Sequence, residues 1–260
     1  MSLLKSPSEI QKLKAGGQIL SDILREVRQK CVPGVTTGEL DTIAKTRILA
    51  AGGVPSFLGY AIDDEVAPYP GALCTSINDE VVHGLPWPSR EIKAGDVVGL
   101  DIGMWYEGLA TDMATTVLVG DQGEDKVKQL VIDTREALVR GLSTIKAGQD
   151  ISVIGAAVED FIKPKGYGIV KDLVGHGVGH AVHEEPQVPN YREPRAPSFT
   201  MKPGLVIAIE PMITLGSWRV NLLPDGWTVV TKDHSLAAHF EVTIVVTETG
   251  YDLITPWPDA

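Results

Sequence analysis

The sequence has few cysteines, few basic residues and no long hydrophobic run. Its two cysteines, Cys31 and Cys74, exclude a disulfide scaffold and a cysteine-built zinc finger and favour a reducing compartment. No stretch of about 18 apolar residues occurs, and the N-terminus lacks a signal-peptide core, so we expect neither membrane insertion nor export. The 23 basic residues against 34 acidic ones leave a net charge of −11, which argues against nucleic-acid binding. We therefore expect a cytoplasmic protein that binds neither DNA nor membranes.

The residues that are present are typical of a soluble globular chain with two helix pairs. Its 260 residues, 43% of them hydrophobic, lie near the upper size limit of a single hydrophobic core. Ser6 and Thr36 are each followed three residues later by a glutamate, which predicts two helix starts with capping boxes. Apolar spacing predicts two more helices over about 127–138 and 151–162, and we expect Asp150 to be the cap of the last one.

The strands repeat as well. Residues 93–101 and 202–210 align at a constant offset of 109 positions, and each segment runs from a lysine through a glycine turn into an apolar strand that ends on a carboxylate. A second apolar strand with its own acid follows in each half. This internal similarity predicts a duplicated α/β unit. We therefore expect one domain over 1–260, made of two pseudo-symmetric halves of about 1–120 and 121–260.

Four acids stand in these apolar strands, namely Asp101, Asp112, Glu210 and Glu241. One interpretation is that each lies at a sheet edge and points to solvent, as single strand acids usually do. The other is that all four meet, which would bury a charge of about −4 and require counter-charge. Two divalent cations would supply that charge, and oxygen ligands together with one imidazole suit manganese, iron, cobalt or zinc.

Histidines supply the imidazole. Three of the six histidines lie within eight residues, at His176, His180 and His183, among glycines that allow close backbone approach. Such a cluster favours a functional site over a structural core, although we interpret His180 by itself as a solvated loop residue. His83 follows a short apolar strand and precedes a Gly/Pro turn, a position where loops hold functional side chains.

Taken together, the segments around these residues resemble the type I methionine aminopeptidases, a family with the duplicated pita-bread fold. The matching segments, in the family's order, are Val82-His83-Gly84, Asp101-Ile102-Gly103, Thr111-Asp112, Gly175-His176-Gly177, His183-Glu184-Glu185-Pro186, Ile209-Glu210-Pro211-Met212 and Phe240-Glu241. The resemblance covers essentially the whole chain. It implies an α/β fold in which a curved, mostly antiparallel sheet carries two helix pairs on its outside.

The same resemblance implies a centre of two divalent metal ions. Asp101 would chelate one ion, Asp112 and Glu241 would bridge the pair, and His176 with Glu210 would complete the other. Glu210 would also act as general base on the attacking water.

The resemblance further implies the contacts to substrate. His183 and His83 would contact the substrate peptide and steady the tetrahedral intermediate or the leaving amine. Cys74 and Trp227 stand where the family has its apolar methionine pocket, although Cys74 is equally well explained as a plain buried strand residue.

Three positions depart from the family's pattern without removing a metal ligand. Val182 replaces an aromatic residue found in many relatives, which would open one pocket wall. His239 and Val242 stand where relatives often have glutamine and histidine. In addition, residues 61–68 predict an acidic surface loop at the rim of the site.

The implied reaction is removal of an N-terminal methionine from nascent polypeptides when the next residue is small. We expect a monomer whose partners are nascent N-termini, with transient ribosome contact through a surface that no segment marks. Two alternatives stay open. The first is an Xaa-Pro aminopeptidase or dipeptidase of the same fold, disfavoured because only 100 residues precede Asp101. The second is a non-catalytic pita-bread binding module, disfavoured because every ligand is retained.

Overall fold

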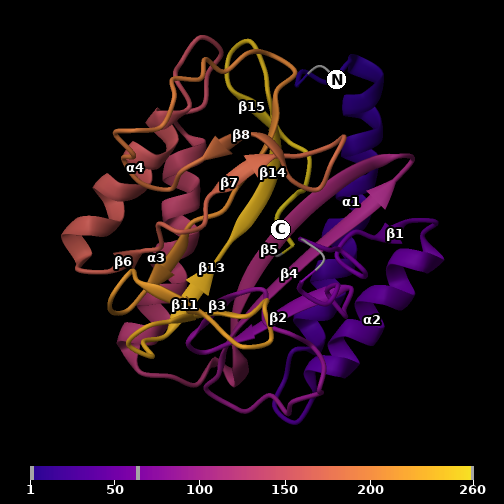
Figure 1. Cartoon of the computed structure of the whole chain (residues 1–260), viewed down its shortest axis with the longest axis vertical. Helices are drawn as coiled ribbons and strands as arrows, with labels where there is room; N and C mark the ends of the chain where they lie inside the picture. Colours follow the sequence, from indigo (N-terminus) through magenta and orange to yellow (C-terminus); the bar gives the residue numbers. More distant parts are fainter. Residues whose placement is uncertain (1–2, 63–64, 259–260) are drawn as a thin grey trace.

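The computed structural model describes residues 3–62 and 65–258, which form one large sheet, two small sheets and four α-helices (Figure 1). The helices are α1 (Pro7–Lys30), α2 (Thr37–Ala50), α3 (Asp125–Leu142) and α4 (Ser152–Ile162), with 3-10 turns η1 (Val119–Asp121) and η2 (Lys163–Lys165). The strands are β1 (Val54–Pro55), β2 (Leu73–Ile77), β3 (Glu80–Val82), β4 (Val97–Tyr106), β5 (Leu109–Leu118), β6 (Gly168–Ile169), β7 (Gly175–Gly177), β8 (Glu184–Val188), β9 (Val206–Ile209), β10 (Met212–Thr214), β11 (Val220–Leu222), β12 (Val229–Thr231), β13 (Ala237–His239), β14 (Glu241–Val246) and β15 (Tyr251–Leu253).

The helix starts follow local chemistry. Ser6 and Thr36 cap α1 and α2 with reciprocal bonds to Glu9 and Glu39, so both predicted capping boxes are confirmed. The predicted cap of α4 is wrong by one residue, because Ile151 occupies the N-cap position. The Asp150 carboxylate still accepts the Ser152 backbone N–H at 3.0 Å, and it also accepts bonds from the Ser198 hydroxyl and the Phe199 N–H.

The large sheet has nine strands, and every strand pair in it is antiparallel. Its main path runs β1-β4-β5-β14-β9-β7-β8, with β2 paired to β4 and β15 paired to β14. The two repeated strands, β4 and β9, therefore flank the central pair β5 and β14. This arrangement brings strands from the beginning, middle and end of the chain side by side.

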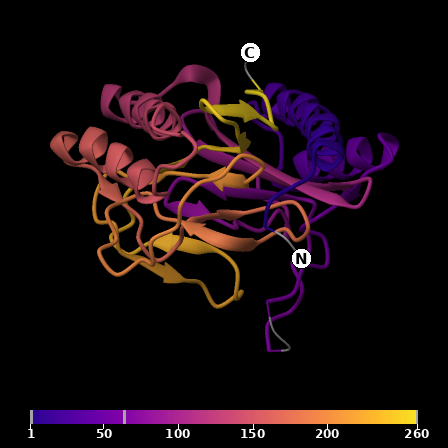
Figure 2. The same cartoon turned by 90° about the horizontal axis from the view of Figure 1, so that it is seen from above.

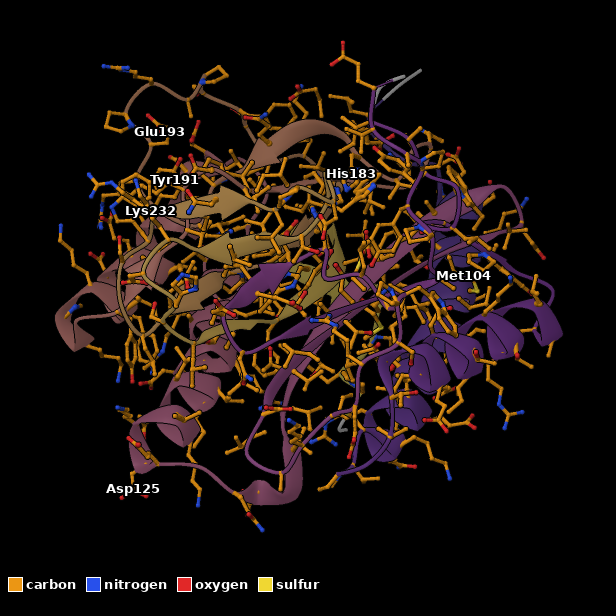
Figure 3. All side chains as sticks on the ribbon, turned by 60° about the horizontal axis from the view of Figure 1, so that its bottom comes forward. Met104, Asp125, His183, Tyr191, Glu193 and Lys232 are labelled. Carbon is orange, nitrogen blue, oxygen red and sulfur yellow. The ribbon has the colours of Figure 1, made fainter. Side chains whose placement is uncertain are left out.

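Period-two alternation gives the large sheet two different faces. On β4, Leu100, Ile102 and Met104 are fully buried against α1 and α2, and Figure 3 shows Met104 beside these helices. On β14, Val242 and Ile244 pack in the same way against α3 and α4. Figure 2 shows both helix pairs on one side of the sheet and the hairpin of β11 and β12 on the other.

These features confirm the predicted α/β fold with a mostly antiparallel sheet and two helix pairs on its outside. The division into halves of about 1–120 and 121–260 stays a prediction. Cys31, the C-cap of α1, is buried in the core beneath α1 and α2, and burial raises the pKa of its thiol to about 12. No helix in the described part of the chain is both long enough and apolar enough to span a bilayer.

Candidate metal centre

Strand register brings three acids to one face of the large sheet. Asp101 on β4 and Glu241 on β14 both lie opposite Ala114 of β5, which stands between them. Asp112 is two residues from Ala114 on the same strand, so alternation points its side chain to the same face. The small side chain of Ala114 leaves the space between the carboxylates open. One oxygen each of Asp101, Asp112 and Glu241 consequently lies within 4.8 Å of the others.

The neighbouring strands add two more side chains. The register that sets Ile209 of β9 opposite Val242 of β14 carries Glu210 to the side of Glu241. His176 on β7 pairs with β9 two residues before Glu210, and its Nε2 is 3.4 Å from Glu210 Oε1. Ligand atoms of His176, Glu210 and Glu241 lie within 4.8 Å of one another. The five residues predicted as ligands are therefore brought together, and the edge-strand interpretation of the acids is wrong.

Burial makes the ionised form of these carboxylates costly. Loss of water raises the pKa of Asp101 to about 7 and that of Glu210 to about 8. It raises the pKa values of Asp112 and Glu241 well above their usual range, and the neighbouring carboxylates add to both shifts. Burial lowers the pKa of His176 to about 3, so its imidazole is neutral. A cation in this cluster would relieve the repulsion between the carboxylates.

The donor atoms fit divalent metal ions. Within the described residues, Asp101 Oδ1, Asp112 Oδ1 and Glu241 Oε1 are buried without a hydrogen-bond partner, although buried polar atoms are normally paired. Oxygen atoms that converge in this way, with one imidazole, form a donor set that divalent transition metals bind. The His176 Nδ1 lies 2.8 Å from the Gly177 carbonyl and donates to it, which leaves the Nε2 lone pair facing Glu210.

His239 joins this cluster, although the sequence predicted no role for it. It is buried, and its Nε2 lies 3.6 Å from Glu210 Oε2 without a hydrogen-bond partner among the described residues. Its backbone N–H donates to Thr116 Oγ1 at 2.9 Å, and its carbonyl accepts from the same hydroxyl at 2.6 Å. The only signal in the sequence was its departure from the family's glutamine. Val242, the neighbouring departure, points instead into the core against α3 and α4.

An apolar cavity of about 250 Å³ opens onto the carboxylates. Its apolar and aromatic walls are formed by Phe57, Tyr60, Ile62, Tyr69, Cys74, Val82, Leu173, Val174, Met212 and Trp227. Cys74 lies opposite Asp101 in the β2–β4 ladder, which puts the cavity wall directly beside the acids. Burial raises the pKa of the Cys74 thiol well above its usual range, so it serves as an apolar wall and not as a nucleophile.

Trp227 closes the cavity from the β11–β12 side. Its indole N–H donates to the Ala67 carbonyl at 2.8 Å, and its ring packs edge to face on Tyr69 with centroids 5.3 Å apart. The structure thus places both predicted pocket residues in the wall of one cavity. Sequence reasoning missed Phe57 and Tyr60, although aromatic residues gathered over 57–69 in a chain with only 6% aromatics were an available signal.

His83 and His183 reach the cavity from two sides. His83 has a φ of 58°, a left-handed conformation that is uncommon outside glycine and often marks a functional position. Burial lowers its pKa to about 4, so the ring is neutral. His183 stands at the cavity mouth just before β8 (Figure 3), with its ring 4.4 Å from that of His176 and its Nδ1 2.9 Å from the Tyr60 hydroxyl.

The structure bears on three further expectations near the cavity. His180 is not a solvated loop residue, because its side chain is 19% exposed and its Nε2 lies 2.7 Å from Glu9 Oε1. In the predicted acidic loop, Ile62 lines the cavity, whereas Asp63 and Asp64 lie outside the described residues. Val182 is buried and is not part of the cavity wall.

Comparison with known proteins agrees with this geometry. Residues 11–248 match metallopeptidase family M24. The chain is 41% identical over 255 residues to methionine aminopeptidase 1 of Bacillus subtilis, covering 98% of this chain and 99% of that protein. The crystal structure of a methionine aminopeptidase from Thermotoga maritima superposes with a TM-score of 0.91 at 40% identity, covering 97% and 98% of the two chains.

A structure from another branch is less similar. An Xaa-Pro dipeptidase from Bacillus anthracis has a TM-score of 0.76 at 26% identity, and the match covers 97% of this chain but 62% of that one. The predicted resemblance is confirmed by the identity and by coverage over the full length. The chain belongs to metallopeptidase family M24 and, within it, to the methionine aminopeptidases.

Proposed function

We propose that this hydrolase removes the N-terminal methionine from polypeptides whose second residue is small. The observation that carries the proposal is the junction of Cys74 and Asp101, where a mainly apolar cavity meets a group of unpaired carboxylates. A long unbranched thioether side chain suits a narrow cavity with aromatic walls. The peptide bond that follows such a side chain would then lie against the acids.

Two divalent ions are the cofactor that we propose for this site. Asp101, Asp112, His176, Glu210 and Glu241 would together hold these ions. When bound, such ions supply Lewis-acid polarisation of a carbonyl group and a water molecule of lowered pKa. Support comes from the balance of charge, because two dications offset four buried carboxylates.

The protein's own side chains perform the proton transfers. Glu210 would accept a proton from the attacking water, since its carboxylate lines the cavity and lies 3.4 Å from His176 Nε2 and 3.6 Å from His239 Nε2. A Tyr60 hydroxyl that donates to His183 Nδ1 leaves the ring proton on Nε2, which can then donate to the substrate. His83, held neutral by burial, would contact the peptide from the other side.

The proposed substrate also determines the setting. Nascent chains carry the initiator methionine, so we propose that the enzyme acts in the cytoplasm on polypeptide N-termini, with transient ribosome contact. We further propose that it works as a monomer, because all five ligands and both histidines come from one chain.

Mass spectrometry of a peptide mixture tests the proposal. Peptides beginning Met-Ala, Met-Lys, Leu-Ala and Ala-Pro are incubated with the protein in manganese or cobalt and, separately, in EDTA. We expect loss of methionine from Met-Ala alone, abolished by EDTA. Cleavage of Ala-Pro would favour the Xaa-Pro alternative.

Metal content separates enzyme from binding module. Elemental analysis of protein loaded with manganese and then desalted should give about two ions per chain, falling to about one or none in Glu241→Ala. A binding module would retain no metal and cleave none of the four peptides.

A further inference from the structure

A lysine near the N-terminus is buried next to the His183 loop. The Lys5 side chain is fully covered, and its ammonium group pairs with the Glu184 carboxylate and lies 3.4 Å from the Leu3 carbonyl. Lys14, which pairs with Asp252 on the surface, is 43% exposed by comparison. A buried ammonium is tolerated only where a fixed counter-charge receives it. The Lys5–Glu184 pair is therefore a specific feature of the fold and not a chance surface contact.

The backbone around Lys5 is anchored to the large sheet. The Lys5 N–H donates to the Gly204 carbonyl at 2.8 Å, and Leu4 forms a bridge with Leu205 just before β9. The lysine side chain then passes over Gly179, where a Cβ atom would lie 2.5 Å from Lys5 Cε. Gly179 also has a φ of +134°, so glycine is needed here for both conformation and space. The N-terminal segment thus reaches the loop between β7 and β8.

Glu184 connects this anchor to the loop that carries His183. Besides pairing with Lys5, its carboxylate accepts the Ala181 N–H at 3.3 Å, and the Gly179 N–H donates to the Ala181 carbonyl at 3.0 Å. The Glu184 side chain therefore ties down the turn that immediately precedes His183. His183 itself is exposed at the cavity mouth, where its ring contacts the Tyr60 hydroxyl and the His176 ring.

A side-chain hydrogen bond from α1 acts on the same loop. His180 Nε2 lies 2.7 Å from Glu9 Oε1, and Glu9 belongs to the capping box that starts this helix. Residues 3–9 therefore hold the loop 179–184 at two points, one buried and one partly exposed.

We propose, building on the function proposed above, that the N-terminal segment positions His183 through the buried Lys5–Glu184 ion pair. Lys5 touches neither the cavity nor the ligands, so it is a positioning residue that acts through its effect on the loop. Without the ammonium group, the Glu184 carboxylate, whose side chain is 15% exposed, loses its counter-charge and draws the loop toward solvent. A catalytic side chain displaced by about 1 Å can lose about a hundredfold in rate.

A mutant cycle with His183 tests this role. Lys5→Met should lower kcat for a Met-Ala peptide by about 10- to 100-fold, with KM and manganese affinity changed less than about threefold. In a His183→Ala background, Lys5→Met should cause less than a further twofold loss, because the group that it positions is gone. A residue that only stabilises the fold would lower activity by the same factor in both backgrounds. That result, or full activity of Lys5→Met, would overturn the proposal.

The matched control is Lys14→Met, which removes an exposed lysine of α1 and should leave kcat within about twofold of wild type. Thermal unfolding shows whether each variant folds. If Lys5→Met does not fold, Lys5→Met/Glu184→Gln removes both charges and keeps an acceptor for Ala181. That double variant should lower kcat by about threefold or more. This loss should be smaller than that of Lys5→Met and should again occur only when His183 is present.

Amide exchange provides a readout that does not depend on the reaction. Exchange over residues 178–184 should be about tenfold faster in Lys5→Met than in wild type or Lys14→Met. If wild type cleaves no peptide, the proposed function is wrong. Amide exchange still tests whether the Lys5–Glu184 ion pair holds residues 178–184 in place. Unchanged exchange over this segment would overturn the positioning role whatever the activity.

Discussion

The two faces of β4 show how one strand serves stability and chemistry separately. Leu100, Ile102 and Met104 face the helices and are fully buried in apolar surroundings. Asp101, between the first two, is also buried, yet it faces unpaired carboxylates. The contrast teaches that burial alone does not distinguish core from site. The core consists of apolar groups that pack against one another, whereas the site contains buried carboxylates that lack hydrogen-bond partners and counter-charge among the described residues.

The largest expected effect on activity comes from removing the charge of Asp101, on the face of β4 that lies against the other carboxylates. Asp101→Asn should lower peptide cleavage by roughly a thousandfold or more, because it removes the charge of a proposed metal ligand while keeping the side-chain shape. In EDTA at pH 8, the same change should raise the free energy of unfolding by about 1–3 kcal/mol, since a buried ionised carboxylate is lost. Activity assays and urea denaturation measure the two quantities. A variant less stable than wild type in EDTA would contradict the assignment of Asp101 to a repulsive cluster.

On the face of β4 that packs against α1 and α2, we expect a substitution to lower stability and to leave activity nearly unchanged. Leu100→Ala should cost about 3 kcal/mol of unfolding free energy by removing a side chain from a closed core. Cleavage per folded molecule should stay within about threefold of wild type. Leu222→Ala, at a side chain that is 61% exposed, should cost less than about 0.5 kcal/mol and is the control for urea denaturation. If Leu100→Ala abolished cleavage in fully folded protein, the two faces would not be separable.

In metal-free protein, we expect the buried acids to lower the free energy of unfolding increasingly as pH rises. Burial raises the pKa values of Asp101 and Glu210 to about 7 and about 8, above those of the unfolded chain. Between pH 5 and pH 8 the unfolded state therefore binds fewer protons than the folded state, so stability falls as pH rises. We expect a loss on the order of 2 kcal/mol between pH 6 and pH 8 in EDTA. Thermal unfolding with and without manganese should show a metal-induced gain that grows over the same range.

A flat stability profile in EDTA would contradict that prediction. Asp101→Asn is the matched control, because it removes one titrating group and should make the profile shallower.

The smallest effect on activity is expected at Tyr60, which contacts His183 at the cavity mouth. Tyr60→Phe keeps the aromatic wall but removes the hydroxyl that lies 2.9 Å from His183 Nδ1. One hydrogen bond of this kind contributes about 1 kcal/mol, so kcat should fall about fivefold with KM nearly unchanged. Steady-state kinetics on a Met-Ala peptide measures kcat and KM separately. A large rise in KM instead would show that Tyr60 binds the substrate and does not orient His183.

Local features of the fold could be predicted from the sequence. The capping boxes at Ser6 and Thr36 depend on residues three positions apart, and the structure contains both. Asp150 lies one residue before the N-cap, and its carboxylate also accepts bonds from Ser198 and Phe199, which are distant in sequence. Short-range hydrogen bonds can be identified from neighbouring residue types, whereas a competing distant partner cannot.

The site was predictable to the extent that its residues lie in recognisable segments. Asp101, Asp112 and Glu241 could be named as candidates because acids in apolar strands need an explanation. Phe57 and Tyr60 were not named, because a cavity wall is defined only by what faces it. His239 was noticed as a departure, but its approach to Glu210 depends on how β13 leads into β14.

The sequence by itself determined which side chains were available, since residue type specifies charge, lone pairs and capping ability. Only the tertiary structure decided which of them meet. Antiparallel register sets Asp101 and Glu241 on either side of Ala114, although 140 residues separate them along the chain. Likewise, nothing in the sequence around Lys5 distinguishes it from a surface lysine, and only the fold buries it against Glu184. Contacts between distant segments depend on strand pairing and packing, which no local pattern of residues encodes.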